Sequence, residues 1–191
     1  MDRRRLLLGL GASVLGAAPA LARKRNTGFY GYEETRPNDY QGAEFVAYET
    51  PERSGTIIID TGERALYHVQ SPGEAMRYGV GVGKQGFEWA GIAKVGRKVE
   101  WPAWTPPADM IARRPELAEY AGGMPGGPDN PLGARAMYLY AGGRDTLFRI
   151  HGTNEPQSIG RAASSGCIRM LNEEVVDLYD HVAIGTKVIV L

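Results

Sequence analysis

A histidine and a cysteine lie sixteen residues apart near the C-terminal end of the chain. His151 closes an apolar run that begins at Leu147, and Cys167, the only cysteine, follows Ser164-Ser165-Gly166. A free thiol has a pKa near 8.5 and is mostly protonated at neutral pH, so a neighbouring imidazole that takes its proton would generate a nucleophile. We therefore predict Cys167 as a nucleophile and His151 as its base.

The run Ser164-Ser165-Gly166 predicts a tight turn directly before Cys167. Backbone N–H groups in such a turn are free to stabilise an oxyanion. The segment from Ile150 to Met170 thus contains the residue types needed for covalent catalysis.

A single cysteine cannot form an internal disulfide, and a lone thiol in an exported protein is open to oxidation or intermolecular pairing. The alternative is a buried cysteine that acts as a small hydrophobe. The cysteine count alone supports the two interpretations equally. The nearby His151 and the turn before Cys167 favour a reactive thiol.

A glycine-rich stretch, Gly81 to Gly86, matches the pattern G-x-G-x-x-G of dinucleotide-binding loops. That motif functions only where a helix N-terminus follows it to hold the pyrophosphate. Phe87-Glu88-Trp89-Ala90-Gly91 does not predict such a helix, so we expect a β-turn shaped by glycines.

A metal site is not expected, because the imidazole and thiol ligands lack the paired short spacings of zinc sites. These ligands are His68, His151, His181 and Cys167. We predict His68 and His181 as surface residues. No cofactor is predicted.

The N-terminus resembles an export signal. Three arginines, Arg3 to Arg5, precede an apolar run from Leu6 to Ala18, and Ala20-Leu21-Ala22 offers a cleavage site. We predict a signal peptide at residues 1–22, with the Sec and Tat routes both open. The run is shorter than the roughly 20 apolar residues of a membrane span, and no nearby cysteine could carry a lipid. We therefore expect a periplasmic or envelope protein without a membrane span after processing.

Composition supports one domain of ordinary size. Removing residues 1–22 leaves a formal net charge of −2, which excludes the basic excess typical of nucleic-acid binders. Glycine and proline account for 38 of 191 residues, which indicates short strands and many turns.

Apolar runs bounded by turn residues predict the strands that must position the site. The clearest is a strand–turn–strand unit over residues 56–69. Further strands are expected at 78–82, 94–101, 135–140, 147–151 and 187–191. This pattern predicts a mainly β fold, a sandwich or barrel, with one or two short helices.

Two helices are expected. Asn172 predicts an N-cap, followed by helical spacing of apolar residues up to Gly185, and a shorter helix is expected from Pro107 to Arg114. Residues 23–54 predict an arm or linker before a catalytic domain at 55–191. The loop from Ala121 to Pro131 cannot form regular structure, and we expect it to border the site as a cover or as an ordered connector.

The segment around Cys167 resembles the signature of the L,D-transpeptidase family, in which His-Gly is followed by Ser-His-Gly-Cys and commonly by an arginine. His151-Gly152, Ser164, Gly166-Cys167 and Arg169 match it. Ser165 departs from it, since the family usually has a histidine there. Stretches at 79–84, 104–107 and 130–133 also resemble the family.

The resemblance implies a mainly β catalytic domain that acts on peptidoglycan stem peptides. Cys167 would attack the carbonyl of the third residue and release the D-alanine that follows. The amides of Ser165, Gly166 and Cys167 would hold the oxyanion, and groups near Gly152 and Thr153 would orient the imidazole.

The resemblance also suggests substrate contacts for Asn154, Ser164 and Arg169. Arg169 would clamp a carboxylate or form an internal ion pair, and we favour the ion pair. The amine acceptor is not identified by any residue. Hydrolysis of the same stems and a silent wall-binding module remain alternatives, whereas papain-like peptidases have the opposite order of cysteine and histidine.

Overall fold

The computed structural model describes residues 40–85 and 89–191. The predicted signal peptide at residues 1–22 lies outside the described residues, as does the predicted arm up to residue 39. Among the helices of the described part, none has both the length and the apolar composition needed to cross a membrane.

Strands dominate the described chain, and the helices are few and short. The strands are β1 (Glu44–Tyr48), β2 (Ile57–Asp60), β3 (Ala65–Ser71), β4 (Gly73–Gly79), β5 (Val82–Gly83), β6 (Gly91–Glu100), β7 (Arg135–Ala141), β8 (Arg144–His151), β9 (Ala162–Ser164), β10 (Ile168–Arg169) and β11 (Lys187–Val190). The helices are α1 (Ala108–Arg113), α2 (Asn172–His181) and the 3₁₀ turns η1 (Pro115–Tyr120) and η2 (Pro156–Ser158).

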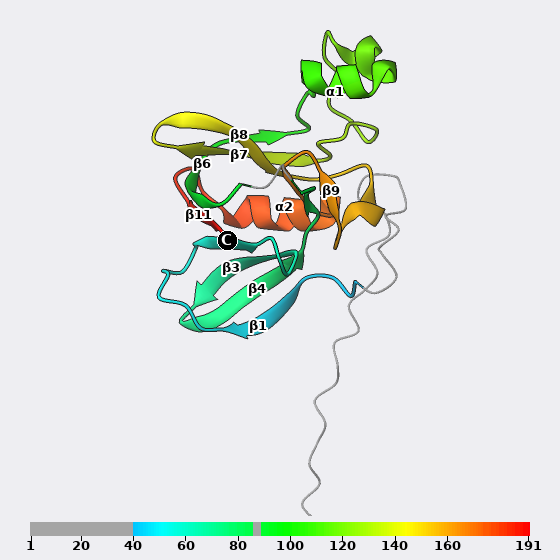
Figure 1. Cartoon of the computed structure of the whole chain (residues 1–191). Coiled ribbons are helices and arrows are strands. Elements are labelled where there is room, and N and C mark those ends of the chain that lie inside the picture. Colours follow the sequence, from blue (N-terminus) through cyan, green and yellow to red (C-terminus); the bar gives the residue numbers. More distant parts are fainter. Residues whose placement is uncertain (1–39, 86–88) are drawn as a thin grey trace, which may run out of the picture.

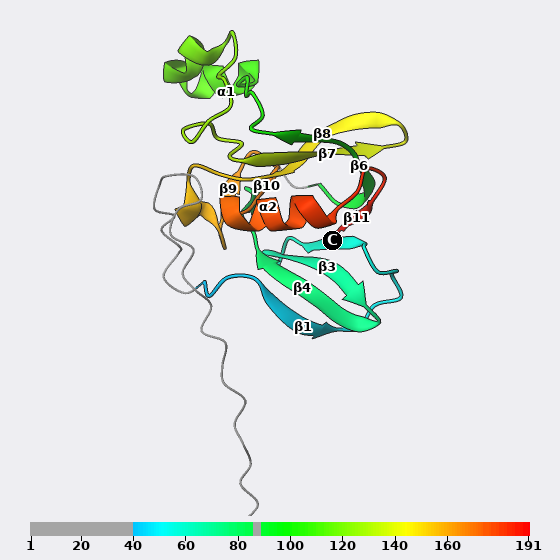
Figure 2. The same ribbon diagram turned by 180° about the vertical axis from the view of Figure 1, so that it is seen from behind.

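Nine strands form one sheet in the order β1-β4-β3-β2-β11-β6-β7-β8-β10, and β5 pairs with β9 in a second, two-stranded sheet. The large sheet bends around α2, so that the β6–β8 half lies on one side of the helix and the β1–β4 half on the other (Figure 1, and from behind in Figure 2). The predicted mainly β fold with few helices is confirmed.

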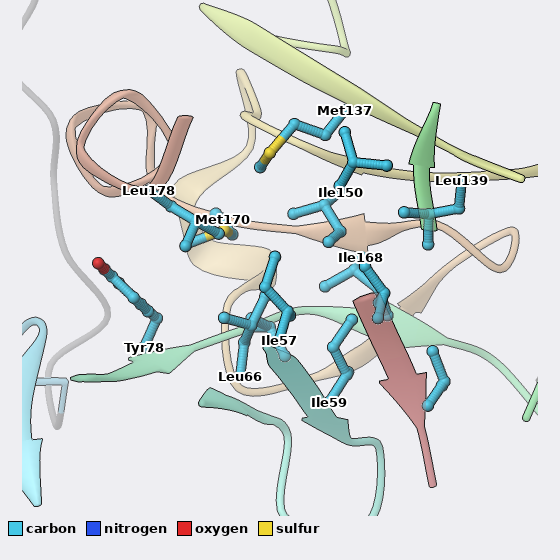
Figure 3. Close-up of a cluster of buried hydrophobic side chains, with 14 of the residues drawn as sticks. Ile57, Ile59, Leu66, Tyr78, Met137, Leu139, Ile150, Ile168, Met170 and Leu178 are labelled. Carbon is cyan, nitrogen blue, oxygen red and sulfur yellow. The ribbon is translucent and has the colours of Figure 1, made fainter. Parts of the chain in front are cut away.

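The main core fills the space between α2 and the inner faces of the sheet. Ile150 of β8 and its β10 partner Ile168 are both buried there, with Leu178 of α2 and Met170 nearby (Figure 3). Because side chains alternate along a strand, the neighbours of Ile150 and Ile168 point to the outer face of the sheet.

Three features differ from the sequence predictions. Part of the predicted arm is strand β1, which pairs with β4. The strand predicted at 78–82 is divided between β4 and β5. His68, predicted at the surface, is 5% exposed in β3, because both faces of that strand are covered.

The helix predicted after Cys167 is present as α2, but Asn172 is its first residue and Leu171 occupies the N-cap. The Asn172 side chain is buried, and its Oδ1 accepts hydrogen bonds from the amides of Ala134 and Thr153, at 2.9 and 3.3 Å. Its Nδ2 donates to the Thr153 carbonyl at 2.9 Å. A Cβ at Gly133 or Gly152 would collide with Asn172 Oδ1, so glycine is required at both positions.

Asn172→Ala should therefore lower the free energy of unfolding by about 2–4 kcal/mol, because it leaves buried backbone groups without partners. Urea unfolding of this variant and of Asn154→Ala provides the comparison, since Asn154 is exposed and should contribute less than about 1 kcal/mol. Similar losses in the two variants would contradict a structural role for the buried amide.

Candidate active site

Parallel pairing of β8 with β10 brings the predicted nucleophile and base together. Ile168 pairs with Ile150 and Arg169 with His151, so Cys167, directly before β10, lies at the position opposite Arg149. Since Ile150 and Ile168 face the core, Cys167 and His151 share the outer face of the sheet. Residues far apart in the sequence are thus positioned by backbone register.

His151 is 4% exposed, and its Nδ1 lies 2.5 Å from the Gly152 carbonyl oxygen. The carbonyl can only accept, so Nδ1 carries the proton and Nε2 keeps its lone pair. No hydrogen bond to Nε2 is found within residues 40–85 and 89–191. Burial, and next the positive charge of Arg169, lowers the pKa of His151 to about 3. The imidazole is therefore a neutral base at neutral pH.

Cys167 is partly exposed, and its Sγ lies 3.8 Å from the Leu147 carbonyl oxygen. Burial of the thiol raises its pKa above the ordinary value, and this outweighs the Arg149 backbone and the charges of Arg149 and Arg169, which lower it. The resting site therefore holds a thiol and a neutral imidazole. An attack by this thiol as a nucleophile would therefore require transfer of its proton in the same step.

A bulge in β8 shapes the wall beside the thiol. The register with β7 shifts between Tyr138 and Tyr140, and Leu147 within the bulge has a φ of 64° although it is not glycine. Asp145 Oδ1 accepts a hydrogen bond from the Leu147 amide at 2.8 Å, which stabilises this conformation. This bulge was not among the expectations from the sequence, although an aspartate two residues before Leu147 is typical of such turns.

The turn before Cys167 is held by Ser164, which is 3% exposed. Its hydroxyl donates a hydrogen bond to the Cys167 carbonyl at 2.6 Å and accepts one from the Gly166 amide at 3.1 Å. The Gly166 amide is thus engaged internally, which argues against the predicted oxyanion contact at that residue. Among the described residues, no such bond occupies the amides of Ser165 and Cys167.

The other predicted site residues also make internal contacts. Asn154 Nδ2 donates to the Asp129 carbonyl at 2.8 Å. Arg169 Nη1 lies 2.6 Å from Glu155 Oε2, so Arg169 forms the internal ion pair expected from the sequence. Thr153 Oγ1 accepts the Glu155 amide at 2.9 Å, so the imidazole is oriented by Gly152 rather than by the Thr153 hydroxyl.

The family model of the YkuD domain, described as the L,D-transpeptidase catalytic domain, matches residues 54–190. The chain belongs to this family. The resemblance inferred from the residues around His151 and Cys167 is thereby confirmed.

Individual relatives agree on the family and differ in length. "Probable L,D-transpeptidase ErfK/SrfK" of Escherichia coli K12 is 36% identical over 140 residues, which is 69% of this chain and 42% of that protein. The chain thus spans less than half the length of this relative. L,D-transpeptidase 3 of Mycobacterium tuberculosis, at 15% identity and a TM-score of 0.51, covers 72% of this chain and 61% of its own and shares the fold.

A solved Brucella melitensis protein is 51% identical, with a TM-score of 0.54 over 78% of this chain and 92% of its own, and is named a "Probable carnitine operon oxidoreductase". Within the described residues of this L,D-transpeptidase domain, the glycine-rich stretch leads into strands and not into the helix N-terminus that dinucleotide binding requires. Val82 and Gly83 form β5, which pairs with β9, and the next regular element in the described chain is strand β6.

The loop from Ala121 to Pro131 of this L,D-transpeptidase domain forms no helix or strand, as predicted. Met124 pairs with Trp104, and the fully buried Asn130 donates to the Met124 and Pro125 carbonyls. These bonds favour an ordered connector over a mobile cover.

The raised pKa of Cys167 and the lowered pKa of His151 predict how the thiol of this L,D-transpeptidase domain reacts. Alkylation of Cys167 by iodoacetamide, followed by mass spectrometry, should accelerate about tenfold per pH unit from pH 6 and keep rising beyond pH 9, because only the thiolate reacts. His151→Ala should keep this slope, because the imidazole is already neutral above a pKa of about 3. A plateau between about pH 5 and 8 would instead indicate a resting thiolate–imidazolium pair.

Proposed function

We propose that the chain is an exported cysteine L,D-transpeptidase that acts on peptidoglycan stem peptides through a thioester. The hydrogen bond from His151 Nδ1 to the Gly152 carbonyl is the observation that carries this proposal, because it presents Nε2 as a base on the face where Cys167 lies. Membership of the L,D-transpeptidase family supports the same acyl-transfer chemistry.

In the first half-reaction, Sγ of Cys167 attacks the carbonyl carbon of the third stem residue while Nε2 of His151 takes the thiol proton. The amides of Ser165 and Cys167 donate to the oxyanion. When the tetrahedral intermediate collapses, the carbon–nitrogen bond breaks and His151 returns the proton to the amine of the leaving D-alanine. A thioester remains on Cys167.

In the second half-reaction, an amine attacks the thioester and His151 accepts a proton from it. The carbon–sulfur bond breaks, and the proton returns to Sγ as a new amide forms. Another stem peptide, a lysine of an envelope protein or a free amino acid would satisfy this chemistry. The same thioester yields to water, so hydrolysis is the alternative outcome.

The arginines and apolar run of residues 1–22 support export to the periplasm or cell envelope. The substrate would be encountered there. A binding module without chemistry is disfavoured, because it would not need a base aligned by the Gly152 carbonyl next to a thiol.

The test is intact mass spectrometry of the protein after incubation with tetrapeptide muropeptides. We expect a covalent adduct on Cys167 and release of D-alanine, with an amide product when an amine is added. A carbapenem, which resembles the acyl donor of this family, should likewise add one equivalent.

Cys167→Ala should form no adduct, and His151→Ala should acylate about 10²–10⁴-fold more slowly, the usual contribution of a general base. His181→Ala is the matched control, because that side chain is exposed on α2. His68 is buried and unsuitable as a control, because its loss would perturb folding. Equal adduct formation by Cys167→Ala would overturn the proposal.

A further inference from the structure

A row of side chains crosses the outer face of the sheet and ends at the nucleophile. Arg97 of β6 pairs with Tyr138 of β7, and Tyr138 pairs with Arg149 of β8. The β8–β10 register places Cys167 next in this row. Three residues that are scattered in the sequence therefore lie on successive strands, with Cys167 directly before the next strand, and all four face away from the core.

The two arginines of the row are not equivalent. Arg149 forms a bidentate ion pair with Asp145, with Nη–Oδ distances of 2.7 and 2.9 Å, so its charge is compensated. Arg97 is exposed, and within the described residues it has no acidic partner. Both guanidinium carbons face the Tyr138 ring, at 4.9 and 4.3 Å from its centroid.

The Tyr138 ring constrains where Arg97 can point. A guanidinium over an aromatic ring keeps its in-plane N–H groups available at its edge, and the fork geometry suits a carboxylate. Neighbouring strands are about 4.8 Å apart, so β6 lies about 14 Å from Cys167 at the level of the backbone. A ligand that contacts both residues must extend over several bonds.

We propose that Arg97 binds a carboxylate of the acyl-donor peptide whose carbonyl Cys167 attacks. This inference rests on the proposed function. The carboxylate lies on the part of the donor peptide that stays attached to Cys167. The carboxylate of the leaving D-alanine would lie too close to Cys167 to reach Arg97. The Arg149–Asp145 pair beside the thiol presents no uncompensated positive charge that would compete for it.

The kinetic test compares Arg97→Gln with Lys94→Gln. Lys94 is an exposed cation on the same face of β6, but it pairs with Tyr140 and lies outside the row. With a tetrapeptide donor, Arg97→Gln should lower kcat/KM for acylation about tenfold, as expected for loss of one charge-assisted hydrogen bond. Lys94→Gln should stay within about twofold. Equal effects of the two substitutions overturn the proposal.

Donors in which one carboxylate at a time is converted to its amide identify the group that is bound. The penalty of Arg97→Gln should disappear with the donor that lacks the contacted carboxylate, and it should persist when only the leaving carboxylate is amidated. A penalty that remains unchanged with every donor overturns carboxylate binding by Arg97.

Calorimetric binding to Cys167→Ala separates this inference from the proposed function. The unmodified peptide should bind about tenfold more tightly to Cys167→Ala than to Cys167→Ala/Arg97→Gln. That difference without turnover by the native chain would support the carboxylate site and overturn the proposed function. Turnover without the difference would overturn the carboxylate site alone.

Discussion

The buried amide of Asn172 is the contact on which the site depends. It bonds the amides of Ala134 and Thr153 and the Thr153 carbonyl, and so joins the start of α2 to the chain on both sides of the β7–β8 hairpin. These bonds fix the peptide between Gly152 and Thr153. Because the Gly152 carbonyl orients His151, the direction of the base depends on the backbone that Asn172 holds.

Electrostatics around the pair favours a resting state without charge. Burial raises the pKa of Cys167 and lowers that of His151, and the cations Arg149 and Arg169 oppose imidazole protonation. A protonated thiol is less open to oxidation than a thiolate. The protonated Cys167 is therefore protected from oxidation in the resting site.

The sequence predicted the elements that local patterns define. The strand–turn–strand unit and helix α2 follow from apolar alternation and helical spacing, and the short motif contains the His151 and Cys167 that the structure places at the adjoining strands β8 and β10. It did not predict β1, the burial of His68 or the role of Asn172, because these depend on partners distant in the chain. Asparagine is a residue type typical of N-caps. The side chain of Asn172 is instead buried against Gly133 and Gly152, which are distant from it in the sequence.

Ser165 stands where the family usually has histidine, and the geometry of the turn does not require a particular side chain at this position. The oxyanion donors proposed for this turn are backbone amides, and the turn is held by Ser164, so neither depends on the side chain at Ser165. Catalytic geometry is thus set by register and backbone bonds. Substitutions of outer-face side chains, such as those of Arg97 and Tyr138, should leave His151 and Cys167 in place, because these side chains extend from strands whose inner faces are fixed in the core.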